Sequence, residues 1–123
     1  MIKNLLLVAL GGGLGSALRY LANVSVTKIW PSKLYYATFL VNIIGCLCIG
    51  LLFGYFQKNQ TDHQTLKLLL ITGFCGGFTT FSAFGLENYN LLQTHNYSTT
   101  LLYLGLSIII GILCVGLGIY LSK

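Results

Sequence analysis

Acidic side chains are nearly missing from this chain of 123 residues. Only Asp62 and Glu87 carry carboxylates, against seven lysines and arginines, so the formal net charge is +5. Charged residues make up only 7% of the sequence, whereas a soluble domain has about 25%. With 55% hydrophobic residues, the composition predicts a membrane protein that forms one compact unit over residues 1–123, without a separate soluble domain. The excess of positive charge favours an anionic partner, either lipid headgroups or a transported anion.

The sequence also lacks the pattern of a metal site or a disulfide framework. Its four cysteines fall inside apolar runs, where cysteine behaves as a small hydrophobe: Cys46, Cys48, Cys75 and Cys114. On a helix, Cys46 and Cys48 point to nearly opposite faces, so they cannot share one metal ion. His63 and His95 fall in predicted loops without neighbouring ligands. A metal held by side chains is therefore not expected.

Four apolar runs predict four membrane-spanning helices joined by short connections. The expected spans are about Asn4 to Ala22, the Trp30–Pro31 region to about Phe56, Leu66 through Leu92, and Thr99 or Thr100 to about Leu121. Short polar loops are expected at Gln57–Thr65 and Gln93–Ser98. No convincing cleavage site follows the first run, so we interpret it as a span and not as a signal peptide. Four spans place both chain ends on the same side of the membrane.

Small residues in the first span indicate close helix packing. Gly11 and Gly15, like Gly12 and Ser16, are four residues apart, a spacing that lets helix backbones approach closely in a membrane. These glycines do not form a dinucleotide-binding loop, because no βαβ pattern surrounds them and no acidic residue follows about 20 residues later. Arg19 has two interpretations: its side chain extends to the interface, or it supplies positive potential to a water-filled mouth.

The third span contains the sequence GFCGGFTTFSAF, residues Gly73–Phe84, which is poorly suited to a continuous helix. Glycine loosens helical backbone, and paired β-branched threonines add little to the stability of a helix. We therefore predict a break near Gly76 to Thr80. Broken backbone at membrane depth is stable only where protein buries it or water reaches it, and such breaks tend to mark ion sites. The alternative is a continuous glycine-rich helix whose hydroxyls bond back to their own helix.

Two other spans carry polar faces at helical spacing: Thr38, Asn42 and Gly45 in the second, and Tyr103, Ser107 and Gly111 in the fourth. An unpaired Asn42 amide deep in an apolar run would cost roughly a few kcal/mol, so it faces water or a partner. The alternative is an interhelical hydrogen bond. Ser107 also has a plain alternative, because a serine can bond a carbonyl of its own helix.

The polar side chains expected at mid-depth are hydrogen-bond donors and not carboxylates: Thr38, Asn42, Thr79, Thr80, Ser82 and Ser107. Donors replace the hydration shell of an anion, whereas a cation path would need carboxylates or carbonyl rings. Phe81 and Phe84 lie on one face after the break, and their positive ring edges suit an anion, although phenylalanines in membrane helices usually pack or face lipid. The pattern therefore favours an anion pathway.

The lysines hardly orient the chain. Lys3, Lys58, Lys67 and Lys123 fall on one predicted side, against Lys28, Lys33 and, if it reaches that end, Arg19 on the other. By the positive-inside rule, an excess of lysine and arginine on one side sets the orientation of a membrane protein. The excess here is small, so insertion in both directions is expected. Four spans are too few to enclose a pore easily by themselves. An antiparallel homodimer would supply the further helices that a pore needs.

Taken with these motifs, the chain resembles the Fluc (CrcB-type) fluoride channels over nearly its whole length. The resemblance rests on Gly12–Tyr20 (GGLGSALRY), Thr38–Gly45 (TFLVNIIG), and Gly73–Phe84 followed by Glu87. It implies an all-α membrane protein with four transmembrane helices, the third broken, that forms an antiparallel, dual-topology homodimer. It also implies two pores that export fluoride passively across the bacterial cytoplasmic (inner) membrane.

The resemblance further implies roles for single residues. The pore set comprises Asn42, Phe81, Phe84 and Ser107, with Thr38, Thr80 and Tyr103 nearby and Arg19 at the vestibule. Backbone carbonyls of Gly76 and Thr79 from both subunits would hold a central structural Na+. Ala83 departs from the family pattern, in which a threonine is expected between the two phenylalanines.

Two other classes are weighed against this one. A small multidrug-type cation/proton antiporter also has four helices, but it needs a carboxylate in the first span, and Asn4–Ala22 has none. A purely structural membrane subunit would explain the glycines but not the clustered donors. Neither an enzymatic activity nor a nucleic-acid partner is expected.

Overall fold

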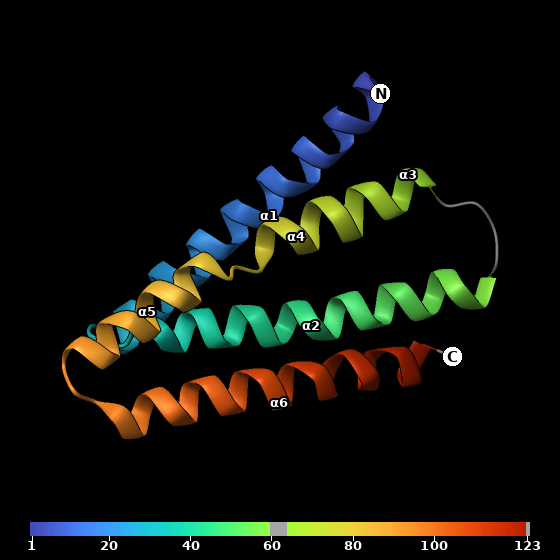
Figure 1. The fold of residues 1–123 in the computed structure, drawn as a ribbon. Coiled ribbons are helices and arrows are strands. Elements are labelled where there is room, and N and C mark those ends of the chain that lie inside the picture. Colours follow the sequence, from blue (N-terminus) through green and yellow to red (C-terminus); the bar gives the residue numbers. More distant parts are fainter. Residues whose placement is uncertain (60–63, 123) are drawn as a thin grey trace.

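The computed structural model describes residues 1–59 and 64–122; Asp62, His63 and Lys123 lie outside the described residues. Four helical segments in it are long and apolar enough to cross a membrane, as the hydropathy predicts: Ile2–Ile29, Leu34–Asn59, Gln64–Gln93 and Tyr97–Ser122. The protein is therefore a multi-pass, all-helical membrane protein. In Figure 1 the N-terminus and the end of α6 lie at the same end of the bundle, as four spans require.

The first helix, α1 (Ile2–Ile29), extends seven residues beyond the predicted end at Ala22. The apolar run ends where polar residues follow Ala22, but the helix continues through these residues. Thr27 Oγ1 donates to the Asn23 carbonyl at 2.8 Å, so its hydroxyl is satisfied by its own helix. Arg19 consequently lies well inside a helix, and the expectation that it stands near a helix end is wrong.

The second helix, α2 (Leu34–Asn59), begins after a turn at Trp30–Lys33 and continues beyond Phe56. The next helical segment, α3 (Gln64–Leu66), begins at Gln64, so residues 57–59 and 64–65 of the predicted Gln57–Thr65 loop are helical. The fourth span is α6 (Tyr97–Ser122), which starts two residues before the predicted Thr99.

The third span is interrupted, as predicted, and the break overlaps the predicted residues at Thr79 and Thr80. It consists of α3, a π-helix η1 (Lys67–Cys75), a helical turn α4 (Gly76–Phe78) and, after the break, α5 (Ser82–Gln93). The helix stops at Thr79, whose φ of −86° and ψ of 158° are those of extended backbone. The break therefore covers residues 79–81: the predicted stretch near Gly76 to Thr80 is correct at Thr79 and Thr80, but it begins three residues too early.

The glycines before the break serve helix packing, which explains why the backbone stays helical there. A methyl group on Gly77 would collide with the Gly12 carbonyl oxygen, and one on Gly15 with the Phe74 carbonyl oxygen. α1 therefore lies directly against η1 and α4, as Figure 1 shows, and the predicted close approach through the first-span glycines is confirmed. α2 and α6 form the second close pair, side by side in Figure 1.

Candidate functional site: a cavity beside the break

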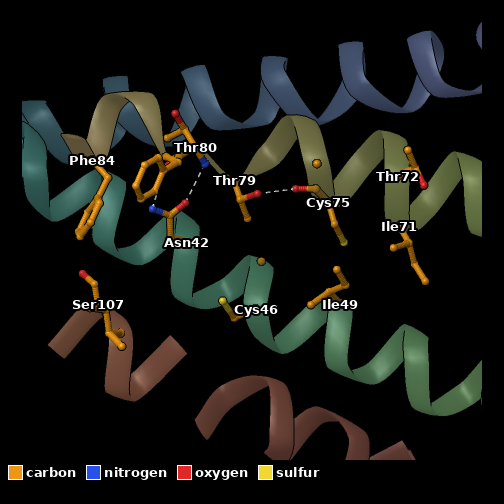
Figure 2. A pocket seen from close by; sticks show the side chains of 14 residues that line it. Asn42, Cys46, Ile49, Ile71, Thr72, Cys75, Thr79, Thr80, Phe84 and Ser107 are labelled. Atoms are coloured by element: carbon orange, nitrogen blue, oxygen red, sulfur yellow. Dashed lines mark hydrogen bonds between the residues drawn. The ribbon is translucent and has the colours of Figure 1, made fainter. Parts of the chain in front are cut away.

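A cavity of about 590 Å³ lies where the break faces α2 and α6 (Figure 2). Six residues singled out in the sequence line it: Asn42, Thr79, Thr80, Phe81, Phe84 and Ser107. Gly76 lines it as well, whereas Thr38, Tyr103 and Arg19 do not. The cavity is open on one side of the chain, where Phe81 is 83% exposed. Most of the predicted set is thus brought together, in a groove that this chain alone does not close.

Asn42 holds the break to α2. Its Nδ2 donates to the Thr80 carbonyl oxygen at 3.0 Å, and its Oδ1 accepts the Thr80 N–H at 2.8 Å (Figure 2). The structure therefore realises the interhelical hydrogen bond that the sequence left open as an alternative. The amide replaces the helical partners that Thr80 has lost, and one N–H of Nδ2 remains available to the cavity.

The two threonines of the break have hydroxyls bonded nearby. Thr79 Oγ1 donates to the Cys75 carbonyl at 2.9 Å, so for this residue the interpretation as a hydroxyl bonded to its own helix is confirmed. Thr80 Oγ1 accepts the Ala83 N–H at 3.2 Å and lies 3.3 Å from the Ser82 hydroxyl. The Thr80 side chain therefore holds the start of α5, whereas the Thr79 hydroxyl donates within the helix before the break and is not free for a ligand.

This bonding leaves two backbone carbonyls without their helical donors. In a continuous helix, the Gly76 carbonyl would accept the N–H of Thr80, and the Thr79 carbonyl that of Ala83. Asn42 takes the first of these N–H groups and the Thr80 hydroxyl takes the second. Gly76 is exposed and both residues line the cavity. Within the described residues, neither of these two carbonyls accepts a hydrogen bond from a backbone N–H.

Phe84 and Ser107 form the wall opposite the amide. The Phe84 ring lies 5.9 Å from the Phe81 ring and packs edge-on against Tyr103, with centroids 4.9 Å apart and an interplanar angle of 69°. Ser107 Oγ is buried and has no hydrogen-bond partner in the described part of the chain. A buried hydroxyl without a partner costs roughly 1–3 kcal/mol, so an acceptor that came within reach of this covered oxygen would be stabilised.

Glu87 organises the end of the site nearer the α5–α6 turn, a role that the sequence analysis missed. Its carboxylate accepts hydrogen bonds from Thr38 Oγ1 at 2.7 Å and from the Tyr103 hydroxyl at 2.8 Å. The donors of Thr38 and Tyr103 are therefore directed to a carboxylate and not into the cavity. One feature of the sequence could have indicated this role. Glu87 follows Phe84 by three residues, so both side chains lie on one face of α5.

Arg19 reaches the break from α1. Its Nε donates to the Gly77 carbonyl at 3.1 Å, and Ser16 Oγ donates to the same oxygen at 3.4 Å. The guanidinium therefore neither snorkels away from the bundle nor lines this cavity. It places a positive charge one residue from Gly76, on the backbone that forms the break.

The chain is similar to proteins of one named family throughout its length. A family model described as CrcB-like protein, Camphor Resistance (CrcB), matches residues 6–119. The chain is 47% identical over 122 residues to a fluoride-specific ion channel of Flavobacterium psychrophilum, covering 99% of this chain and 98% of that protein. It is 49% identical over 120 residues to one of Gloeothece citriformis, covering 98% and 97% of the two chains. These relatives are named as ion channels, which are not enzymes. With a matching family model over nearly all of its length and close relatives that cover both chains, the protein belongs to the CrcB-like family.

Proposed function

We propose that this protein is a fluoride channel that lets F− cross the membrane passively. The observation that carries the proposal is the cavity beside the break, where the unpartnered Ser107 hydroxyl, the Asn42 amide and the Phe84 ring converge. Among the described residues, no carboxylate lines it. Its hydrogen-bond donors and ring edges suit a small dehydrated anion, provided that a cation neutralises the free carbonyls of Gly76 and Thr79, which line the same cavity. The relatives named as fluoride-specific channels identify the anion.

Each lining group has a distinct part in this proposal. The free N–H of Asn42 and the hydroxyl of Ser107 replace part of the hydration shell of fluoride. Phe81 and Phe84 present ring edges, which attract an anion weakly enough to let it leave. Thr38 and Tyr103, both bonded to Glu87, form a second polar cluster next to Phe84. In this proposal the ion reaches that cluster once it has passed the rings of Phe81 and Phe84.

A second copy of the chain completes the pore in this proposal. The cavity is open on one side, and Phe81 is 83% exposed beside it. An antiparallel homodimer, with two pores, would cover both surfaces at once. The small lysine bias between the two ends, Lys3, Lys58, Lys67 and Lys123 against Lys28 and Lys33, supports insertion in both orientations.

The same dimer would hold a structural Na+ between the carbonyls of Gly76 and Thr79 of both copies. The support is that both carbonyls have lost their helical donors, which lipid cannot replace. A small cation satisfies four such oxygens without any carboxylate. Its positive field, and that of Arg19 beside Gly77, would also favour anions in the neighbouring pores.

The test is fluoride efflux from liposomes that contain the purified protein. Potassium fluoride is trapped inside, a potassium ionophore is added to release the charge, and external fluoride is measured with an electrode. We expect rapid efflux that requires the ionophore, and none from chloride-loaded vesicles monitored for chloride. A cation/proton antiporter would instead require an opposing cation or proton gradient. Fluoride release no faster than from protein-free liposomes would overturn the proposal.

A further inference from the structure

A second cavity, of about 330 Å³, lies at the end of the bundle where α1 runs into α2 and α5 into α6 (Figure 1). It lies between the start of α2 and the start of α6, and its walls expose only apolar atoms. Trp30, Tyr35, Tyr36, Leu102 and Leu106 contribute to it. No residue lines both cavities, but Tyr103, whose ring packs against Phe84 of the first cavity, lines this one.

The mouth of this aromatic cavity is built at the depth of the membrane interface. Trp30 packs edge-on against Tyr36, with centroids 5.4 Å apart, and Tyr36 packs edge-on against Tyr35 at 5.0 Å. Tryptophan and tyrosine at the end of a span occupy the headgroup region of the bilayer. A cavity that opens there and is apolar inside has the character of a site for part of an acyl chain.

A fixed positive charge stands over the same rings. Lys33 Nζ donates to the Tyr35 hydroxyl at 3.3 Å and lies 5.8 Å from the ring centroids of both Tyr35 and Tyr36. A lysine ammonium is charged at physiological pH without any shift, and the hydrogen bond to Tyr35 raises the pKa of Lys33 further. Lys28, in the last turn of α1, adds a second cation at this end. Glu87, the single acidic side chain in the described part of the chain, is already bonded to Thr38 and Tyr103.

We infer that the aromatic cavity binds an anionic phospholipid, with an acyl chain between α2 and α6 and the headgroup phosphate at Lys33. Charge favours this occupant over a second copy of the chain. Both ends of the bundle are cationic, with Lys3, Lys58 and Lys67 at the opposite end. A second copy laid over this mouth, in either orientation, would bring lysines against Lys33, whereas an anionic headgroup neutralises it.

The experiment uses Trp30, the only tryptophan of the protein, as the reporter. The full-length protein is reconstituted in phosphatidylcholine vesicles that contain increasing fractions of phosphatidylglycerol or phosphatidylcholine brominated on the acyl chains. Bromine quenches tryptophan fluorescence on contact. We expect brominated phosphatidylglycerol to reach half-maximal quenching at a mole fraction about five-fold lower, the preference that one lysine typically provides near an anionic lipid.

Matched variants separate this site from general contact with lipid. Lys33→Gln should abolish the preference and Lys33→Arg should keep it, while Lys3→Gln, an equal change of charge at the other end, should leave it intact. Leu102→Phe fills the cavity and should weaken quenching by brominated phosphatidylglycerol, whereas Leu101→Phe, outside the lining, should not.

Equal quenching by the two lipids in the unaltered protein would overturn the proposal, since it would mean unselective contact with surrounding lipid. Absence of quenching by either lipid would overturn it as well, because another chain would then cover Trp30. Fluoride transport is not measured in this experiment, so its outcome leaves the proposed channel function untouched.

Discussion

Replacing Asn42 with alanine tests whether this side chain both holds the break and serves the pore. The substitution removes the hydrogen bonds to the Thr80 N–H and the Thr80 carbonyl together. A fully buried backbone group left without a partner costs roughly 1–3 kcal/mol, and the two Thr80 groups are only partly buried, beside an open cavity. The expected loss of folding free energy is therefore at most roughly 2–6 kcal/mol, against the about 5–15 kcal/mol that stabilises a typical domain.

Replacing Asn42 with aspartate separates the two roles. The carboxylate can still accept the Thr80 N–H, so this variant should keep more stability than the alanine variant. It loses the donor and puts a negative charge in an anion path. A hydrogen bond to a charged group is worth roughly 1.5–3 kcal/mol, so fluoride flux should fall by roughly ten-fold to a hundred-fold, and further through charge repulsion.

The assay combines thermal unfolding of the purified variants with fluoride efflux from liposomes. Asn59→Ala is the matched control, because the Asn59 amide bonds only the Tyr55 carbonyl of its own helix in an exposed position. We expect that control to behave like the unaltered protein. An Asn42→Ala protein with normal unfolding temperature and normal flux would refute the reasoning, since neither the break nor the pore would then depend on the amide.

Four further outcomes are expected. Phe81→Ile retains an apolar side chain without the ring edge, so fluoride flux should fall while the protein still folds; normal flux would make the ring a packing residue only. Gly15→Ala should destabilise the protein by pushing α1 away from the backbone of Phe74, whereas Gly13→Ala, with nothing near its added methyl, should be neutral. Prolonged replacement of Na+ by a large inert cation should weaken both dimer and flux, and unchanged values would exclude the ion at Gly76. Tags at the C-terminus should be found on both sides of the membrane, and two lysines added beside His95 should bias the orientation and lower activity.

Hydropathy and short-range spacing were sufficient for the architecture. The four spans follow from apolar runs because the cost of burying a residue in lipid is largely a property of that residue. The four-residue spacing of Gly11 and Gly15 predicted a close helix contact for a similar local reason, since only small side chains let two backbones approach. The sequence GFCGGFTTFSAF likewise indicated an interrupted third span.

The exact place of the break and the bonding of its polar groups depend on tertiary structure. Gly76 and Gly77 look like helix breakers in the sequence, yet the helix continues to Phe78, and α1 packs against the backbone at Gly77. Thr38 and Tyr103 look like pore donors, but both donate hydrogen bonds to the Glu87 carboxylate. Thr38 is 49 residues from Glu87 in the sequence and Tyr103 is 16 residues from it, so no local pattern predicts these bonds. The sequence alone determined which segments enter the membrane, because that depends on each residue's own transfer energy. Only the tertiary structure decided which carbonyls and hydroxyls stay free, because a hydrogen bond between distant residues exists only once the helices have packed.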